Sequence, residues 1–213
     1  ADPDGALVGA ESVGDLAGNA DLVVEHCTAA VEQGAHLIVF PEMMLTGYPL
    51  EDLAMRLSLI KASQAGIEAL AVRLKDEGCG DLVAMVGYLD QKPDVVDAPG
   101  IPKNAPQNNV AIIHDGTIVA RQAKHHLWNY GVGDEIRNFV AGDTINIVQI
   151  GGIDVALAIC EDLWRDGPSA APGKSLSQRR PPDERDHRPE HDGREQGHED
   201  VASPFSPDLG EIN

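Results

Sequence analysis

The chain has 213 residues, 42% of them hydrophobic and 4% aromatic, which predicts one globular domain with an aliphatic core. Its 35 acidic residues outnumber 16 basic ones, and the formal charge of −19 argues against nucleic-acid binding and against docking on anionic lipid. Its three cysteines lack CxxC spacing, which argues against a disulfide framework or a zinc site and favours the reducing cytoplasm.

The N-terminal part predicts a strand, a helix and a second strand. Residues 6–10 make a poor first strand because glycine interrupts the apolar run. Asn19 is a candidate N-cap for a helix over residues 20–33, and Gly34 is expected to end that helix. The continuous apolar run His36–Phe40 is typical of a buried parallel strand.

The middle of the chain predicts a long helix followed by a strand. The helix runs from about Glu51 to Glu77, with a break expected near residues 64–66. Leu82–Leu89 is the next predicted strand. Residues 91–107 are rich in Pro, Asp and Gly, which predicts a long loop.

A first hairpin is predicted where Asn109–His114 and Thr117–Ala123 flank Asp115-Gly116, because such a dipeptide is typical of tight hairpin turns. Residues 124–138 then predict an irregular loop. In a second hairpin, Ile145–Ile150 pairs with Ile153–Ile159, and the latter is expected to be a buried strand. This order of helices and strands predicts an α/β fold with a mixed sheet.

Three polar residues, Glu42, Lys124 and Cys160, each follow a predicted strand. Singly, each has an ordinary explanation: a solvated loop carboxylate, an exposed lysine and a small core hydrophobe. Together they form a coherent set, because a cysteine needs a base or a neighbouring cation to become a good nucleophile. Glu42 can take the thiol proton, and Lys124 can stabilise an oxyanion on an attacked carbonyl. Strand ends at the same edge of a sheet are neighbours, so these three residues can converge. We therefore hypothesise a catalytic site with Cys160 as the nucleophile.

Three motifs in this order resemble the nitrilase superfamily, and in particular the glutamine amidohydrolase domain of glutamine-dependent NAD⁺ synthetases. They are FPEM with LTGYP within residues 40–49, KHHL with NYGV and DE within residues 124–135, and ICEDLW at residues 159–164. The similarity runs from about Val13 to Gly167. Three motifs at compatible spacing are more specific than any one of them.

The resemblance implies an α-β-β-α sandwich and a Glu-Lys-Cys triad. Glu42 would be the general base, Lys124 the oxyanion stabiliser and Cys160 the nucleophile. Glu135 matches a second family glutamate that supports the lysine.

The resemblance also implies a substrate pocket. Tyr48 and Tyr130 match positions that line the glutamine pocket, and Glu161 lies beside the nucleophile. The loop after the lysine usually reads LPNYGVFDE in the family, whereas Trp128 and Gly133 replace its Pro and Phe here. This departure affects the expected shape of the pocket and leaves the triad intact.

The match to the family ends after Gly167. We therefore expect residues 1–167 to form a partial glutaminase domain, with a sandwich incomplete at its C-terminal side. Residues 168–213 are rich in Pro, Arg, His, Asp and Glu, and are expected to form a disordered tail. The tail resembles a frameshifted or truncated reading frame, and no ATP-pyrophosphate motif of a synthetase domain is found in the sequence.

The expected function is hydrolysis of the glutamine amide through a cysteine thioester, which would supply ammonia for ATP-dependent amidation of deamido-NAD⁺. A stand-alone amidase acting on another small amide is the alternative, and a catalytically inactive fragment is the alternative of a different class. No cofactor or metal is expected for the amidase step, while ATP and Mg²⁺ belong to the synthetase domain.

The expected small-molecule partner is L-glutamine, with no nucleic acid and no membrane, and a family-like homo-oligomer is compatible with the resemblance. No signal peptide and no apolar run of about 18 residues are seen, so a cytoplasmic location is expected.

Overall fold

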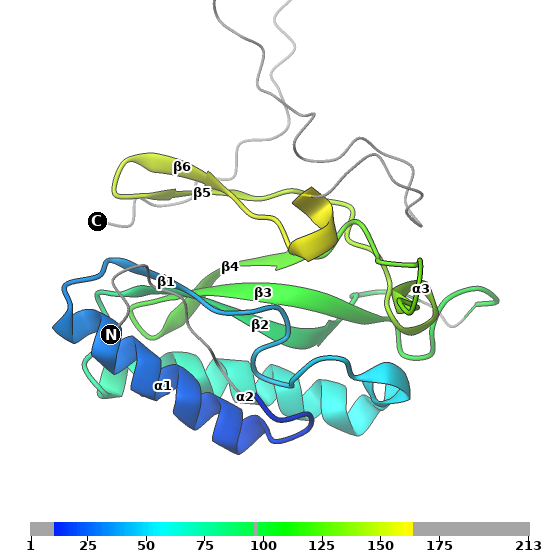
Figure 1. Cartoon of the computed structure of the whole chain (residues 1–213), viewed down its shortest axis with the longest axis horizontal. Helices are drawn as coiled ribbons and strands as arrows, with labels where there is room; N and C mark the ends of the chain where they lie inside the picture. The colour runs from blue at the N-terminus through cyan, green and yellow to red at the C-terminus, as the bar shows by residue number, and fades with distance from the viewer. Residues whose placement is uncertain (1–10, 96–97, 164–213) are drawn as a thin grey trace, which may run out of the picture.

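The computed structural model describes residues 11–95 and 98–163, which form three layers (Figure 1). Two long helices cover one face of a four-stranded sheet, and a two-stranded hairpin lies over the other face (Figure 1). The predicted α/β class is therefore confirmed. The strand expected at residues 6–10 and the tail expected at residues 168–213 lie outside the described residues.

Helix α1 spans Leu16–Glu32, one turn earlier than predicted. Its N-cap is Asp15, whose carboxylate accepts a hydrogen bond from Gly18 N at 3.0 Å. The expected cap, Asn19, is instead a buried helical residue whose side-chain amide donates to Leu45 O at 3.1 Å. A tertiary contact thus accounts for this asparagine. The helix ends as predicted before Gly34, which has a φ of +75°.

Helix α2 spans Leu57–Asp76 and is preceded by a separate 3₁₀ helix, η1, over Glu51–Met55. The predicted single helix is therefore broken at Arg56, whose ψ of 114° is extended, and the break expected near residues 64–66 is wrong. Gly66 stays helical, and the helix there lies close to the Leu45 side chain.

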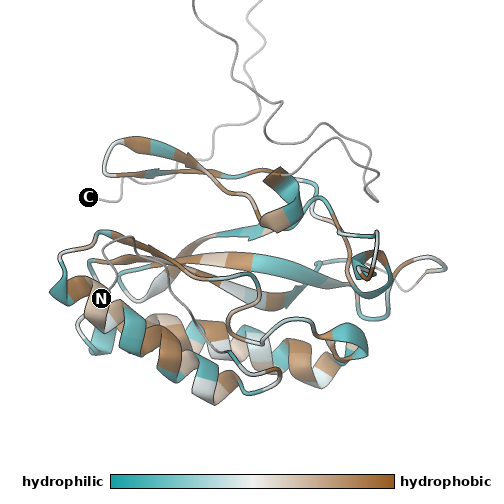
Figure 2. Cartoon of the chain, viewed as in Figure 1, coloured by the Kyte–Doolittle hydropathy of each residue, from teal (hydrophilic) through white to brown (hydrophobic). Residues whose placement is uncertain are grey.

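The main sheet has the order β1-β2-β3-β4. Strand β1 (Leu37–Val39) pairs parallel with β2 (Val83–Gln91), and the antiparallel strands β3 (Pro106–His114) and β4 (Thr117–Ala123) follow. The turn between β3 and β4 is the predicted Asp115-Gly116, with φ values of +47° and +75°. Apolar residues are prominent along the strands and alternate with polar ones along both helices (Figure 2).

The core packs mainly between the helices and the sheet, through Val23, Cys27, Ile67, Leu70 and Val86. Strand β1 is an edge strand of the described sheet. Only its central residue, Ile38, is buried, while Val39 is 57% exposed. The parallel pairing of this strand was predicted correctly, whereas its full burial was not.

The second hairpin consists of β5 (Ile147–Ile150) and β6 (Ile153–Ala156), as its turn glycines predicted. Strand β6, however, ends at Ala156 and is largely exposed, so the prediction of a buried strand reaching Ile159 is wrong. Leu157 N still donates to Asn146 O at 3.2 Å, and the described chain then continues without further strand pairing into the 3₁₀ helix η2, Cys160–Leu163. Cys160 therefore opens a helical turn, with a φ of +47°, and does not cap a buried strand.

A few apolar side chains attach this hairpin to the main sheet. Val148 and Leu157 are buried against residues of the central strands, Val83, Met85 and Ile112. The loop between the two hairpins, expected to be irregular, contains the short helix α3, Glu135–Asn138. In the part of the chain that the structure describes, no helix is long and apolar enough to cross a membrane.

Candidate active site

Glu42 lies just after β1, where the backbone crosses close to β2. Phe40 N donates to Met85 O and Leu45 N donates to Gly87 O, each at 2.9 Å. A Cβ atom on Gly87 would lie 2.3 Å from Met43 N, so a glycine is required for this close approach. The crossing directs the Glu42 carboxylate toward β3, where Asn108 Nδ2 donates to its Oε1 at 2.6 Å.

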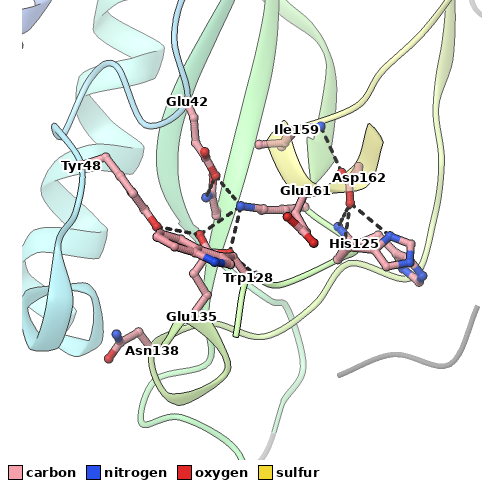
Figure 3. Close-up of polar contacts among 12 residues, drawn as sticks. Glu42, Tyr48, His125, Trp128, Glu135, Asn138, Ile159, Glu161 and Asp162 are labelled. Carbon is pink, nitrogen blue, oxygen red and sulfur yellow. Dashed lines mark hydrogen bonds and ion pairs between the residues drawn. The ribbon is translucent and has the colours of Figure 1, made fainter. Parts of the chain in front are cut away.

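Lys124 follows β4 directly and is 1% exposed. Its backbone N–H donates to Asn108 O at 2.8 Å, which continues the pairing of β3 with β4. Its Nζ lies 2.7 Å from Glu42 Oε1 and 2.9 Å from Glu135 Oε2 (Figure 3 shows both glutamates). Burial acts to lower the pKa of Lys124, but the two carboxylates outweigh it and raise the pKa, so the ammonium is charged.

Glu135 opens α3 and is buried beside the lysine. Both of its oxygens are used: Trp128 N donates to Oε2 at 2.7 Å, and the Tyr48 hydroxyl donates to Oε1 at 3.2 Å. These bonds fix a second carboxylate against Lys124 Nζ, which is the position that the sequence resemblance implied. Burial, followed by the charges of the two glutamates, raises the pKa of Tyr48 and keeps its hydroxyl protonated.

Cys160 is solvent-accessible and opens onto a cavity of about 520 Å³. Glu42 and Asn108 contribute to the same cavity, whose remaining walls are mostly apolar residues of β1, β2 and the segment 155–159. Partial burial, followed by the charge of Glu42, raises the pKa of the Cys160 thiol, while Lys124 acts to lower it. The resting sulfur is therefore a thiol with a carboxylate nearby, an arrangement suited to proton removal during attack.

The charges of the cluster add to the effect of burial on this resting state. Two carboxylates, Glu42 and Glu135, surround one ammonium, Lys124, which leaves one net negative charge beside the sulfur. A preformed thiolate is disfavoured next to that charge. A carbonyl that develops negative charge during attack would meet the Lys124 ammonium, which is held in place before the reaction.

The two predicted pocket tyrosines lie in different surroundings. Tyr48 lines a second cavity of about 340 Å³ together with Trp128 and Glu135. The Tyr130 hydroxyl donates to Glu161 Oε2 at 3.0 Å, and its ring contacts Trp128 edge-on, with centroids 6.0 Å apart. Among the described residues, neither tyrosine lines the cavity of Cys160, although the charges of Glu42 and Cys160 act on the Tyr48 hydroxyl. A shared glutamine pocket stays a prediction.

The Trp128 ring packs directly on Gly133. A Cβ atom at Gly133 would lie 2.3 Å from an indole carbon. The two departures from the family's loop pattern therefore fit each other: the large residue occupies the space beside the residue that lacks a side chain.

Two buried polar residues of this region were missed in the sequence. Asn108 contacts Glu42, and its signal was a polar run, Gln107–Asn109, that directly precedes the apolar half of the strand. Asp162 is 1% exposed, and its signal was a second carboxylate immediately after Glu161. Neither residue type identifies its partners, because the contacts to Glu42, His125 and His126 come from segments distant in sequence. Within the described residues, no group of three His, Cys, Asp or Glu side chains could hold a metal ion.

The layered α/β fold, with glutamate, lysine and cysteine side chains gathered at one place, defines a candidate carbon-nitrogen hydrolase. Residues 6–171 match the carbon-nitrogen hydrolase family, and the chain belongs to that family.

Among its relatives, the glutamine-dependent NAD⁺ synthetase of Thermotoga maritima is 34% identical over 166 residues, which cover 78% of this chain and 26% of the relative. The corresponding synthetase of Acinetobacter baylyi is 32% identical and covers 71% of this chain and 25% of its own length. The chain thus spans about a quarter of the length of the curated relatives that it matches.

Solved structures agree with this assignment. The glutamine-dependent NAD⁺ synthetase of Acinetobacter baumannii matches 72% of this chain and 26% of its own, with a TM-score of 0.61 and 30% identity. A variant of the Nesterenkonia AN1 amidase of the nitrilase superfamily matches 71% of this chain and 53% of its own, with a TM-score of 0.54 and 20% identity. The second match shows the fold alone.

Proposed function

We propose that this chain hydrolyses the side-chain amide of glutamine through a thioester on Cys160. The observation that supports this most directly is the buried Lys124 ammonium, held at 2.7 Å by Glu42 and at 2.9 Å by Glu135. A buried cation and an available base beside an accessible thiol are what thiol attack on an amide requires.

In the first half of the reaction, the Cys160 sulfur attacks the amide carbon while Glu42 takes the thiol proton. The developing oxyanion is stabilised by the Lys124 ammonium. The carbon–nitrogen bond then breaks, and Glu42 returns the proton to the leaving nitrogen, so that ammonia departs and a thioester remains.

In the second half, water attacks the thioester carbon and Glu42 accepts the proton of the water. The carbon–sulfur bond breaks, the thiolate regains a proton, and the carboxylic acid leaves. Atoms and protons balance over the cycle: one amide and one water give one acid and one ammonia. Glu135 supports the cycle by holding Lys124 in position.

Glutamine is the first choice of substrate because the relatives described above that are at least 30% identical are glutamine-dependent NAD⁺ synthetases. In that setting the released ammonia would be used to amidate deamido-NAD⁺, and ATP and Mg²⁺ would serve that later step. Another small amide is the second candidate. The packing of Trp128 on Gly133 favours it, because this pair changes the loop that carries Tyr130.

The test uses ammonia release from glutamine, asparagine and simple aliphatic amides, together with a glutamine-like diazo-ketone that alkylates a catalytic thiol. We expect turnover of glutamine and one adduct, located on Cys160 by mass spectrometry. Cys160→Ala should abolish both, whereas Cys79→Ala, which removes a buried cysteine elsewhere, should preserve both. Turnover of other amides alone would support the second candidate, and no turnover with no adduct would contradict both.

A further inference from the structure

Asp162 is a buried carboxylate that joins two catalytic segments. Its Oδ1 accepts hydrogen bonds from His125 N at 3.0 Å and His126 N at 2.7 Å, and its Oδ2 accepts one from Ile159 N at 3.0 Å (Figure 3). His125 and His126 directly follow Lys124, while Ile159 directly precedes Cys160. One side chain therefore connects the backbone beside the cation to the backbone beside the thiol.

The three hydrogen bonds explain how a 1% exposed carboxylate is tolerated at this position. A buried carboxylate is costly unless donors replace its water, and backbone N–H groups are effective donors to an ionised oxygen. The His126 ring lies farther away, with Nδ1 3.5 Å from Oδ1. The backbone contacts are thus the shorter ones, and they fix the direction in which each segment approaches Asp162.

The same residue closes the turn that contains Cys160. Asp162 N donates to Ile159 O at 3.1 Å, while Ile159 N donates back to the Asp162 carboxylate. Cys160 lies between the two residues in the left-handed region, at a φ of +47°, which is unfavourable for a residue with a side chain. Because β6 has already ended at Ala156, no strand pairing within the described part of the chain holds this turn.

We infer that Asp162 is a positioning residue that sets the Cys160 thiol against the Lys124 ammonium; this inference rests on the proposed function. Its effect on catalysis is indirect, since its oxygens contact backbone N–H groups and leave the reacting atoms to Cys160, Glu42 and Lys124.

Asp162→Asn should affect the contact with Ile159 N while it keeps the contacts with His125 N and His126 N. An amide has one acceptor oxygen, which can stay with the two N–H groups of His125 and His126. Its NH₂ group must then face Ile159 N–H, where donor meets donor. The variant therefore loosens the Cys160 turn while the loop after Lys124 stays anchored. Asp162→Glu keeps both acceptor oxygens and the charge, but lengthens the side chain by one methylene.

The matched control is Asp154→Asn, the same substitution at an exposed carboxylate in β6, which accepts only from Gln149 Nε2 among the described contacts, at 3.2 Å. Full-length wild type and the three variants are compared by kcat and KM for amide hydrolysis, by the rate of Cys160 alkylation with iodoacetamide, and by thermal midpoint. In Asp162→Asn we expect kcat to fall roughly 10–100-fold, with KM within about threefold and an altered alkylation rate in folded protein. Asp154→Asn should match wild type.

The outcomes separate the two proposals. Unchanged kcat and unchanged alkylation in Asp162→Asn, with only a lower thermal midpoint, would overturn the positioning role. Wild type that neither turns over amides nor reacts with the diazo-ketone would overturn the proposed function, and the iodoacetamide rates would still test whether Asp162 controls Cys160. If Asp162→Asn does not fold, Asp162→Glu decides the question by the same readouts: lowered kcat supports positioning, and wild-type kcat contradicts it.

Discussion

The two halves of the candidate site are held in different ways. Glu42 and Lys124 follow strands of the four-stranded sheet and contact each other at 2.7 Å in an ion pair whose lysine is buried and whose glutamate is partly buried. Cys160 follows a two-stranded hairpin whose β6 residues are largely exposed, and three residues separate it from the end of β6. The charged half is thus built into the sheet, whereas the thiol half is attached to it. The described contacts that attach the thiol half include those of Asp162 and Leu157, and each can be removed by a single substitution.

Lys124→Met should have the largest effect because it disrupts the charged half. It leaves the buried Glu135 and the partly buried Glu42 without their shared cation, which should cost about 3–5 kcal/mol of the free energy of unfolding. Loss of the oxyanion stabiliser should lower kcat roughly 10²–10³-fold. Urea denaturation and ammonia release measure the two effects.

Lys92→Met is the matched control, because Lys92 pairs with a largely exposed carboxylate, Asp143, at 2.9 Å. Its expected cost is below about 1 kcal/mol. Equal destabilisation by the two substitutions would show that the buried position of Lys124 adds nothing to the pairing.

Leu157→Ala should weaken the attachment of the thiol half. The leucine is buried against the central strands, and its truncation should cost about 2–3 kcal/mol. Hydrogen exchange should quicken in β5 and β6 more than in β2 and β3, and Cys160 alkylation should change with it. Ile153→Ala removes a β6 side chain that is 68% exposed, so its expected cost is within about 0.5 kcal/mol. Uniform loss of protection across both sheets would contradict a separately attached hairpin.

The difference between the halves also decides what could be predicted from the sequence. Local signals located the hairpin turns and the end of α1, and they singled out Glu42, Lys124 and Cys160 as candidate site residues. The same signals misplaced the N-cap at Asn19, because its side chain bonds to Leu45 O, 26 residues away. A capping asparagine and a tertiary one look alike in sequence.

The thiol half was predicted least well, because its burial also depends on contacts that are not local in sequence. The run Val155–Ile159 is continuously apolar, which is typical of a buried strand, but only part of it forms a strand. Leu157 and Ile159 are buried by packing outside the strand ladder. Asp162 could not be recognised because its three donors are backbone N–H groups, which carry no sequence signal. The pattern of apolar residues indicates which side chains are buried, but in this segment buried residues continue beyond the end of the strand.

A smaller effect concerns how the charged half acts on the thiol. The Glu42 charge raises the pKa of Cys160 and the Lys124 charge lowers it, so removing each should shift the pH midpoint of alkylation in opposite directions. Glu42→Gln should move the midpoint to lower pH and speed alkylation below it, because more thiolate is present. The same variant should lose amide hydrolysis, since its base is gone. Lys124→Met should move the midpoint to higher pH.

Iodoacetamide rates measured between about pH 6 and 11, a range around the ordinary thiol pKa, with the adduct assigned to Cys160, would measure these shifts. Glu77→Gln, at the exposed end of α2, is the control and should leave the midpoint unchanged. A shift in the same direction for Glu42→Gln and Lys124→Met would contradict the electrostatic coupling between the two halves.

The smallest expected effect lies in the loop beside the charged half, where Trp128 packs on Gly133. Gly133→Ala should cost about 1–2 kcal/mol, because the new methyl group meets a rigid ring. Trp128→Leu should remove most of that penalty, so the double variant should be more stable than the sum of the single effects predicts. Gly131→Ala is the control: its new Cβ would meet no other described residue within 4 Å apart from its chain neighbours, and its φ is +63°. Its cost therefore comes from backbone strain and should persist in Trp128→Leu. Additive effects for Gly133→Ala and Trp128→Leu in urea denaturation would show that the loop relaxes around the methyl group. A preference for small amides other than glutamine would then have to be explained by other residues of the site.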